Sequence, residues 1–140
     1  MRLTRDSRYA IEALIVLSSV PGDEMMDARE IARSAHLPAP FLSKILRSLA
    51  LAGVLRSQRG KGYSLARPAG RVALDEVLRA VEGNDVIWET CIFWREECDT
   101  EHPCPLHFRW QDLKPGIKES MGSITLADIV EHGVEPPGGH

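Results

Sequence analysis

The sequence lacks the patterns of membrane-spanning and secreted proteins. No uninterrupted apolar run comes near the roughly 18 residues that a membrane span needs. The opening residues MRLTRDSRYAIEAL carry charges among their apolar side chains, and they contain neither the apolar core nor the cleavage site of a signal peptide. We therefore expect a cytoplasmic protein that has no membrane partner and whose thiols stay reduced.

Motifs of the common enzyme classes are also missing. The sequence contains no Gly-rich phosphate loop, no nucleophile elbow and no HExxH pattern. Cys104 and His107 form a nominal Cys–His pair, but a nucleophile three residues from its base on one helix is unusual. We expect a protein that is not an enzyme.

Acidic residues are absent from one long stretch, between Ile31 and Leu74. The net charge is -3, yet residues 1–67 hold 11 Lys/Arg against 6 Asp/Glu, while residues 68–140 hold 6 against 14. The cations of the carboxylate-free stretch are Arg33, Lys44, Arg47, Arg56, Arg59, Lys61, Arg67 and Arg71. This distribution indicates a surface for a polyanion such as nucleic acid. The alternative is a solvated face whose counter-charges come from elsewhere in the fold.

Hydrophobic periodicity predicts a helix-turn-helix in the first fifty residues. A first helix is expected within residues 5–20, and a short second helix begins at an Asp27 cap and ends near residue 37. A third helix follows Pro38 and ends at Gly53. Its buried stripe is Leu42, Ile45, Leu46 and Leu49.

The face of the third helix opposite this stripe carries Ser43, Lys44, Arg47 and Ser48. Cations meet phosphates, and short hydroxyls can approach base edges. An ordinary wet helix face would usually carry some Glu. We interpret this face as the recognition surface of a DNA-binding helix.

A β-hairpin is predicted directly after the third helix. Two short strands, at residues 54–55 and 63–65, are joined by SQRGKG, in which Gly60 and Gly62 permit a tight turn. Arg59 and Lys61 alternate with these glycines. A hairpin in this place is the wing of a winged helix, with cations at its tip.

Three more helical segments are expected in the second half. One lies within residues 71–82, one within residues 105–122, and a last helix begins at a Thr125–Asp128 capping pair and ends at Gly133. Pro115-Gly116 falls inside the second of these, so we expect a kink or a new helix start at Pro115.

All three cysteines lie in one stretch, CIFWREECDTEHPCPLH, at residues 91–107. An odd number of cysteines leaves at least one unpaired, and paired C-x2-C knuckles are absent. The spacing C-x6-C-x5-C, with His107 three residues later, suits an iron–sulfur cluster, a structural zinc, or free thiols that sense oxidants. Spacing alone leaves these three alternatives open.

Several stretches together resemble one family of bacterial winged-helix regulators, the Rrf2 family, which includes IscR- and NsrR-like iron–sulfur regulators. They are MRLTRDSRYAIEAL, IARSAHLPAPFLSKILRSLALAGVLRSQRGKGYSL, CPLHFRW and ITLADIV, together with Cys91 and Cys98. The resemblance implies a cluster of 2Fe–2S or 4Fe–4S type held by Cys91, Cys98 and Cys104. The gap between the first two cysteines is one residue longer than in familiar members.

The resemblance also implies that the fourth ligand varies. It is either a histidine, here His107, or an acidic side chain of the first helix, from the same or the partner chain. Arg8 stands near that acidic position in this sequence, with Asp6 and Glu12 on either side. This favours His107 and leaves the two carboxylates as alternatives.

The sequence thus predicts a mainly α winged helix-turn-helix with a small hairpin wing, and the resemblance implies that the C-terminal helix is a dimerisation helix. The expected parts are a DNA-binding domain (1–83), a cysteine-containing sensor loop (84–104), a dimerisation helix with a final short helix (105–133) and a flexible tail (134–140). The function that the resemblance implies is a homodimeric repressor that binds a palindromic operator in double-stranded DNA under control of the cluster. The expected DNA contacts are Ser43, Lys44, Arg47, Arg59, Lys61, Arg2 and Arg5. The alternative is a winged-helix module with zinc or free redox-active thiols.

Overall fold

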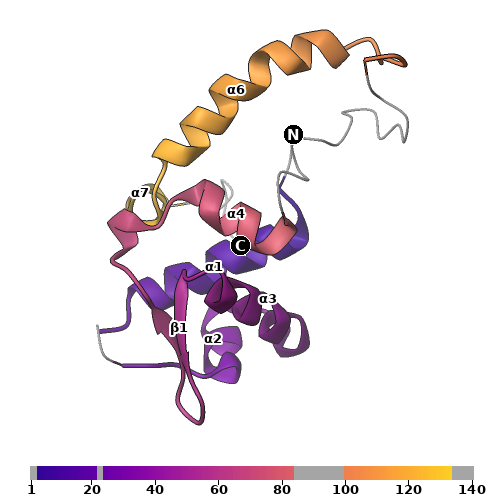
Figure 1. Ribbon diagram of the computed structural model, residues 1–140. Helices are drawn as coiled ribbons and strands as arrows, with labels where there is room; N and C mark the ends of the chain where they lie inside the picture. The colour runs from indigo at the N-terminus through magenta and orange to yellow at the C-terminus, as the bar shows by residue number, and fades with distance from the viewer. Residues whose placement is uncertain (1–2, 22–23, 84–99, 134–140) are drawn as a thin grey trace.

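The computed structural model describes residues 3–21, 24–83 and 100–133, and Figure 1 shows their arrangement. The elements in chain order are α1 (Arg5–Ser18), α2 (Ala28–Ala35), α3 (Ala39–Leu51), β1 (Leu55–Gln58), β2 (Gly62–Leu65), the 3-10 turn η1 (Ala69–Arg71), α4 (Leu74–Glu82), α6 (His107–Ser123) and α7 (Leu126–His132). Helices α1 to α4 pack around one another beside a two-stranded hairpin. This is the winged-helix architecture that the sequence predicts.

Local capping chemistry sets where the first three helices begin. The Thr4 side chain accepts a hydrogen bond from the backbone N–H of Ser7, and the Asp27 side chain accepts one from Glu30. Helix α2 ends at His36, whose φ of 57° is left-handed, and Pro38 precedes the first residue of α3. The predicted stripe of α3 is buried in the shared core.

The hairpin is antiparallel and pairs Leu55 with Leu65 and Gln58 with Gly62. Both strands differ from the expected bounds, because residues 57 and 58 of the predicted loop belong to β1 and Gly62 belongs to β2. The turn is therefore only Arg59-Gly60-Lys61, and Gly60 and Gly62 have the expected positive φ, 81° and 110°. Short turns of this kind hold the tip residues close to the strand ends.

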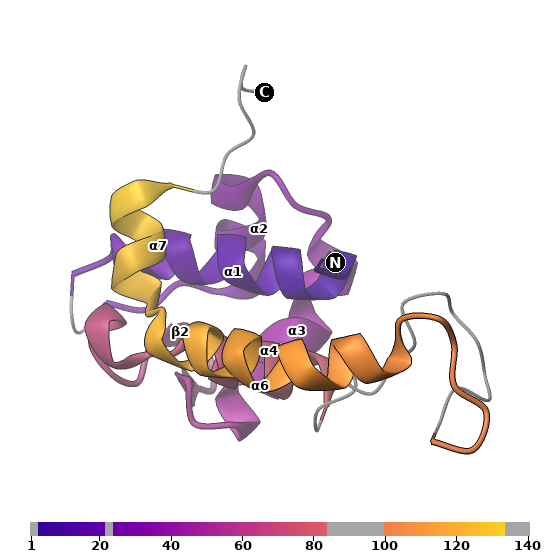
Figure 2. The ribbon, with the colours of Figure 1, turned by 90° about the horizontal axis from the view of Figure 1, so that it is seen from above.

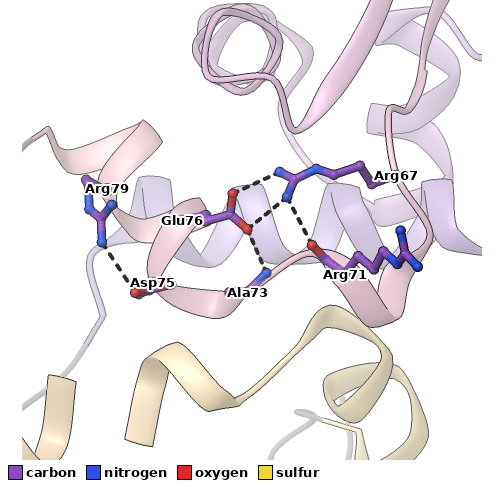
Figure 3. A network of polar contacts seen from close by, with 6 residues as sticks. All are labelled: Arg67, Arg71, Ala73, Asp75, Glu76 and Arg79. Atoms are coloured by element: carbon purple, nitrogen blue, oxygen red, sulfur yellow. Dashed lines mark hydrogen bonds and ion pairs between the residues drawn. The ribbon is translucent and has the colours of Figure 1, made fainter. Parts of the chain in front are cut away.

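A polar network fixes the path from the hairpin to α4, as Figure 3 shows. The Arg67 guanidinium binds the Glu76 carboxylate, with Nη2 to Oε1 at 2.9 Å, and also donates to the Arg71 carbonyl at 3.0 Å. Glu76 in turn accepts a hydrogen bond from the Ala73 backbone N–H. Ala73, the N-cap residue of α4, has no side chain that could cap the helix. The carboxylate of Glu76, at the third position of the helix, therefore pairs with a backbone N–H that would otherwise lack a partner.

Helix α7 returns to the body of the molecule. Leu74 and Leu126 donate backbone hydrogen bonds to the carbonyls of Ile124 and Val72, both at 2.8 Å, and Leu126 is buried in the core. Helix α7 contacts η1 and α1. Figure 2 shows α7 beside α1, whereas the N-terminal end of α6 extends away from the winged-helix body.

Helix α6 is continuous through Pro115, so the expected new helix start at Pro115 is wrong. Proline removes one backbone donor, which leaves the carbonyl four residues earlier without its helical partner. The residues before Pro115 are mostly exposed, and water can satisfy that carbonyl. The C-terminal end of α6 contacts α4.

Within residues 3–21, 24–83 and 100–133, none of the helices combines the length and the hydrophobicity that a membrane span requires.

Candidate nucleic-acid interface and cysteine centre

The solvent face of α3 carries the side chains that the sequence assigned to DNA. Ser43, Lys44 and Arg47 are exposed, and Ser48 is half-buried. The two serine hydroxyls donate back to carbonyls one turn earlier, at 3.5 Å from Ser43 to Ala39 and 3.2 Å from Ser48 to Lys44. Neither cation forms an ion pair with any residue that the structure describes. This face is therefore basic and open.

The wing extends this basic surface. Arg59 and Lys61 at the hairpin turn are exposed, and ion pairs within the described ranges involve neither of them. A shallow hollow at the side of the hairpin is lined by Met25, Arg56, Gln58 and Lys61. A convex helix face flanked by a cationic hairpin is the geometry with which winged helices bind a duplex.

Phe41 is a surface residue that the sequence reasoning missed. It lies in the first turn of α3 and is 48% exposed. The Arg5 guanidinium stacks over its ring at 4.5 Å from the centroid and also lies over the Tyr9 ring, at 5.9 Å from that centroid. The available signal was its spacing of three residues before Lys44, which places both on one side of the helix.

Of the two DNA contacts expected at the N-terminus, the structure describes only one. Arg2 lies outside the described residues. Arg5 is near α3, as required, but its side chain also contacts Asp6 at 3.4 Å. Arg8 pairs with Glu12 at 3.2 Å one helical turn away. Both carboxylates that the sequence offered as alternative cluster ligands thus have an arginine neighbour.

The cysteine segment is described only at its C-terminal end. Cys91 and Cys98 lie outside the described residues, as does the segment from 84 to 99. Cys104 is buried, His107 is the buried first residue of α6, and the backbone N–H of His107 donates to the Cys104 carbonyl at 3.0 Å. Among the residues with described positions, no three His, Cys, Asp or Glu side chains converge on one point. The structure therefore describes only two of the four predicted ligands, Cys104 and His107, and the ligand set stays a prediction.

The chemistry of this pair fits a thiolate-bound metal centre. The Cys104 sulfur and the His107 imidazole belong to residues three apart at the start of α6, and both are ligand types that such centres use. Burial of both side chains keeps bulk water from the donors. Free thiols in a redox sensor would have the same location.

Glu82 links the C-terminal end of α4 to α1. It is the last residue of α4, and its carboxylate accepts hydrogen bonds from the hydroxyls of Thr4 and Ser7, the latter at 2.9 Å. Ser7 is fully buried. The first turn of α1 therefore contacts both the end of α4 and, through Arg5, the start of α3.

The fold and the basic surface agree with a comparison to known families. The model of the Rrf2 family, described as iron-dependent transcriptional regulators, matches residues 3–132. The chain belongs to the Rrf2 family. It is a DNA-binding transcription regulator by family, and regulators of this kind are not enzymes.

Relatives and solved structures that match include proteins named IscR and CymR. The Rrf2 chain is 30% identical to the HTH-type transcriptional regulator IscR of Xenorhabdus nematophila, over 94% of this chain and 80% of that protein. The structure of T. potens IscR superposes with a TM-score of 0.70 at 25% identity, covering 94% of this chain and 88% of that one. CymR, the global cysteine regulator of B. subtilis, superposes with a TM-score of 0.73 at 22% identity, covering 96% and 99%. The last likeness concerns the fold alone.

Proposed function

We propose that this Rrf2 protein is a repressor that binds a palindromic operator as a homodimer, and that an iron–sulfur cluster controls its affinity. The observation that carries the DNA-binding part is the open basic surface of α3 and the wing. Within it, Lys44, Arg47, Arg59 and Lys61 have no carboxylate partner among the described residues. The IscR-named relatives support the cluster part.

In this proposal the two parts of the surface have separate roles. Ser43, Lys44 and Arg47 enter the major groove, where cations bind phosphates and short polar groups reach base edges. Arg59 and Lys61 contact the adjacent minor groove or its phosphates. Arg2 and Arg5 add contacts to the backbone. These contacts to the DNA backbone position the protein mainly through charge.

The proposed cluster ligands are Cys91, Cys98, Cys104 and His107. An iron–sulfur cluster bound by them would supply a group that reacts with oxidants and nitric oxide. The chain's own part is to hold its donors: burial of Cys104 and His107 excludes water, and Cys104 lies three residues before His107, the first residue of α6. We propose that residues 105–133 serve dimerisation, that residues 84–104 form the sensor loop, and that residues 1–83 bind DNA.

The DNA-binding part is tested with Arg59→Ala. Loss of one phosphate contact should weaken binding to an operator duplex at moderate salt and should lower the slope of log affinity against log salt by about one. Fluorescence anisotropy over a salt series measures both quantities. Unchanged affinity and slope would contradict the proposed contact between the wing and DNA.

The cluster part is tested with protein purified without oxygen. We expect visible absorbance, with iron and acid-labile sulfide, and we expect Cys98→Ala to lose all three. Retained colour in this variant would show that the ligands are wrong.

A second candidate function follows from the cysteine spacing, which also suits zinc or free thiols. In this alternative the winged helix is the same, and the cysteines hold zinc or remain as free redox-active thiols. Elemental analysis distinguishes the cases, because it finds iron with sulfide, zinc alone, or neither metal.

A further inference from the structure

Phe41 is a large apolar side chain on the same exposed face of α3 as Lys44. It lies in the first turn of the helix and keeps 48% of its surface exposed. A single exposed aromatic residue is ordinary on a protein surface. Its surroundings decide what it can bind.

Those surroundings are cationic and hold the ring in place. The Arg5 guanidinium stacks 4.5 Å from the centre of the Phe41 ring, an interaction of cation–π type that ties the ring to α1. Lys44 lies one turn further along α3, and no acidic residue occurs between Ile31 and Leu74. An exposed ring bordered by cations complements a polyanion better than it complements the apolar surface of another protein.

The chemistry of the ring limits what it can read. Residues at the N-terminal end of a recognition helix contact base edges in the major groove. Phenylalanine has no hydrogen-bonding group, so it cannot distinguish donors from acceptors there. The one apolar group on a major-groove edge is the 5-methyl group of thymine.

We propose that Phe41 contacts a thymine methyl group and thereby selects a T·A pair at one position in each half-site. Arg5 is a positioning residue, which limits the rotation of the ring through its stacked guanidinium. This inference rests on the proposed DNA-binding function and adds a base preference to it.

The experiment removes one methyl group at a time. The wild-type protein first selects duplexes from a random-sequence library, and each thymine of the selected duplex is then replaced singly by deoxyuridine, which lacks only the methyl group. We expect about a fourfold loss of wild-type affinity at one position per half-site, which corresponds to one buried methyl group. If no single replacement weakens binding, the inference is overturned.

Variants then assign the effect to the ring. Phe41→Ala should bind the thymine and deoxyuridine duplexes equally, while Phe41→Leu keeps an apolar contact and should retain part of the difference. Arg5→Met should give a thymine-to-deoxyuridine affinity ratio between those of wild type and Phe41→Ala. If Arg5 only stabilised the fold, its loss would leave this ratio unchanged. Leu51→Ala is the matched control, because Leu51 is an 84% exposed apolar residue at the other end of α3.

The outcomes separate this inference from the proposed function. A wild-type protein that selects no duplex contradicts the proposed function itself. Selection of a duplex, followed by the same thymine-to-deoxyuridine ratio in wild type and Phe41→Ala, overturns only the role of Phe41. Thermal unfolding of each variant verifies that it is folded before binding is compared.

Discussion

Glu76 is the residue at which charge contributes most clearly to the fold. The hydrogen bond from Arg67 lowers the pKa of this carboxyl from its ordinary value of 4.5, the Ala73 N–H lowers it further, and partial burial opposes both. A carboxylate whose pKa is lower in the folded than in the unfolded state stabilises the fold above its unfolded pKa. That stabilisation is lost as the pH falls below about 4.5.

We predict that Glu76→Gln destabilises the protein near neutral pH by about 0.5–1 kcal/mol, as expected for a partly exposed pair. Urea unfolding should show a difference from wild type at pH 7 that shrinks as the pH falls below 4. Glu12→Gln, which breaks the exposed Arg8 pair, is the control and should cost only a few tenths of a kcal/mol. A difference that is constant with pH would exclude the proposed role of the charge.

Gly62 is a second residue whose identity the backbone determines. A Cβ at this position would lie 2.2 Å from the Met26 carbonyl oxygen, and its φ of 110° is rarely adopted by other residues. Close approach is needed because Met26 and Tyr63 exchange backbone hydrogen bonds at 3.0 and 2.8 Å. The wing is thereby fastened to the segment before α2.

We predict that Gly62→Ala is clearly more destabilising than Gly60→Ala. Gly60 has a positive φ of 81° and open space around a Cβ, so its substitution carries only backbone strain of about 1 kcal/mol. Gly62→Ala adds a backbone clash and should break the contact between Met26 and Tyr63. Denaturant midpoints measure the difference, and equal midpoints would show that the clash is relieved without cost.

At the scale of elements, α1 and α4 are joined by a partly buried polar contact. The Ser7 hydroxyl is fully buried and donates to the Glu82 carboxylate, which also accepts from Thr4. A buried hydroxyl that loses its partner carries an unmet hydrogen-bonding group, at a cost of about 1–3 kcal/mol. The contact also anchors the last turn of α4, directly before the cysteine segment.

We predict that Glu82→Ala destabilises the protein by about 1–3 kcal/mol and that Ser7→Ala in the same background adds much less than it does alone. Chemical unfolding of the four proteins of this double-mutant cycle gives the coupling. Additive effects would mean that Ser7 and Glu82 do not act through their hydrogen bond.

Elements with local patterns could be predicted from the sequence. The Asp27 and Thr125 caps and the buried stripe of α3 are fixed by residues three or four apart, and all agree with the structure. The contact of Arg5 with Phe41 could not be predicted, because it joins segments that are distant in sequence and has no periodic pattern. The continuity of α6 through Pro115 depends on solvent exposure, which the local sequence does not specify.

At the scale of the whole molecule, the return of α7 was the least predictable feature. Helix α6 contacts α4, and α7 after it contacts η1 and α1. There Leu126 enters the same core as the residues of α1 and α3. The α7 sequence shows a capped helix, but it contains no information about which surface the helix covers. The same holds for the proposed cluster site. Its expected ligands come from segments that only the fold can bring together, and local sequence patterns do not specify this.

The packing of α7 leads to a prediction for the whole chain. Leu126 is 2% exposed, so Leu126→Ala should destabilise the protein by about 2–5 kcal/mol through lost burial and the cavity left behind. Val130→Ala, on the 44% exposed side of the same helix, should cost less than 1 kcal/mol. Denaturant unfolding followed by far-UV circular dichroism should show one transition that moves as a unit in Leu126→Ala, because α7 and the winged helix share a core. If the transition splits, or if both variants behave like wild type, α7 is a separate appendage and the DNA-binding fold is complete without it.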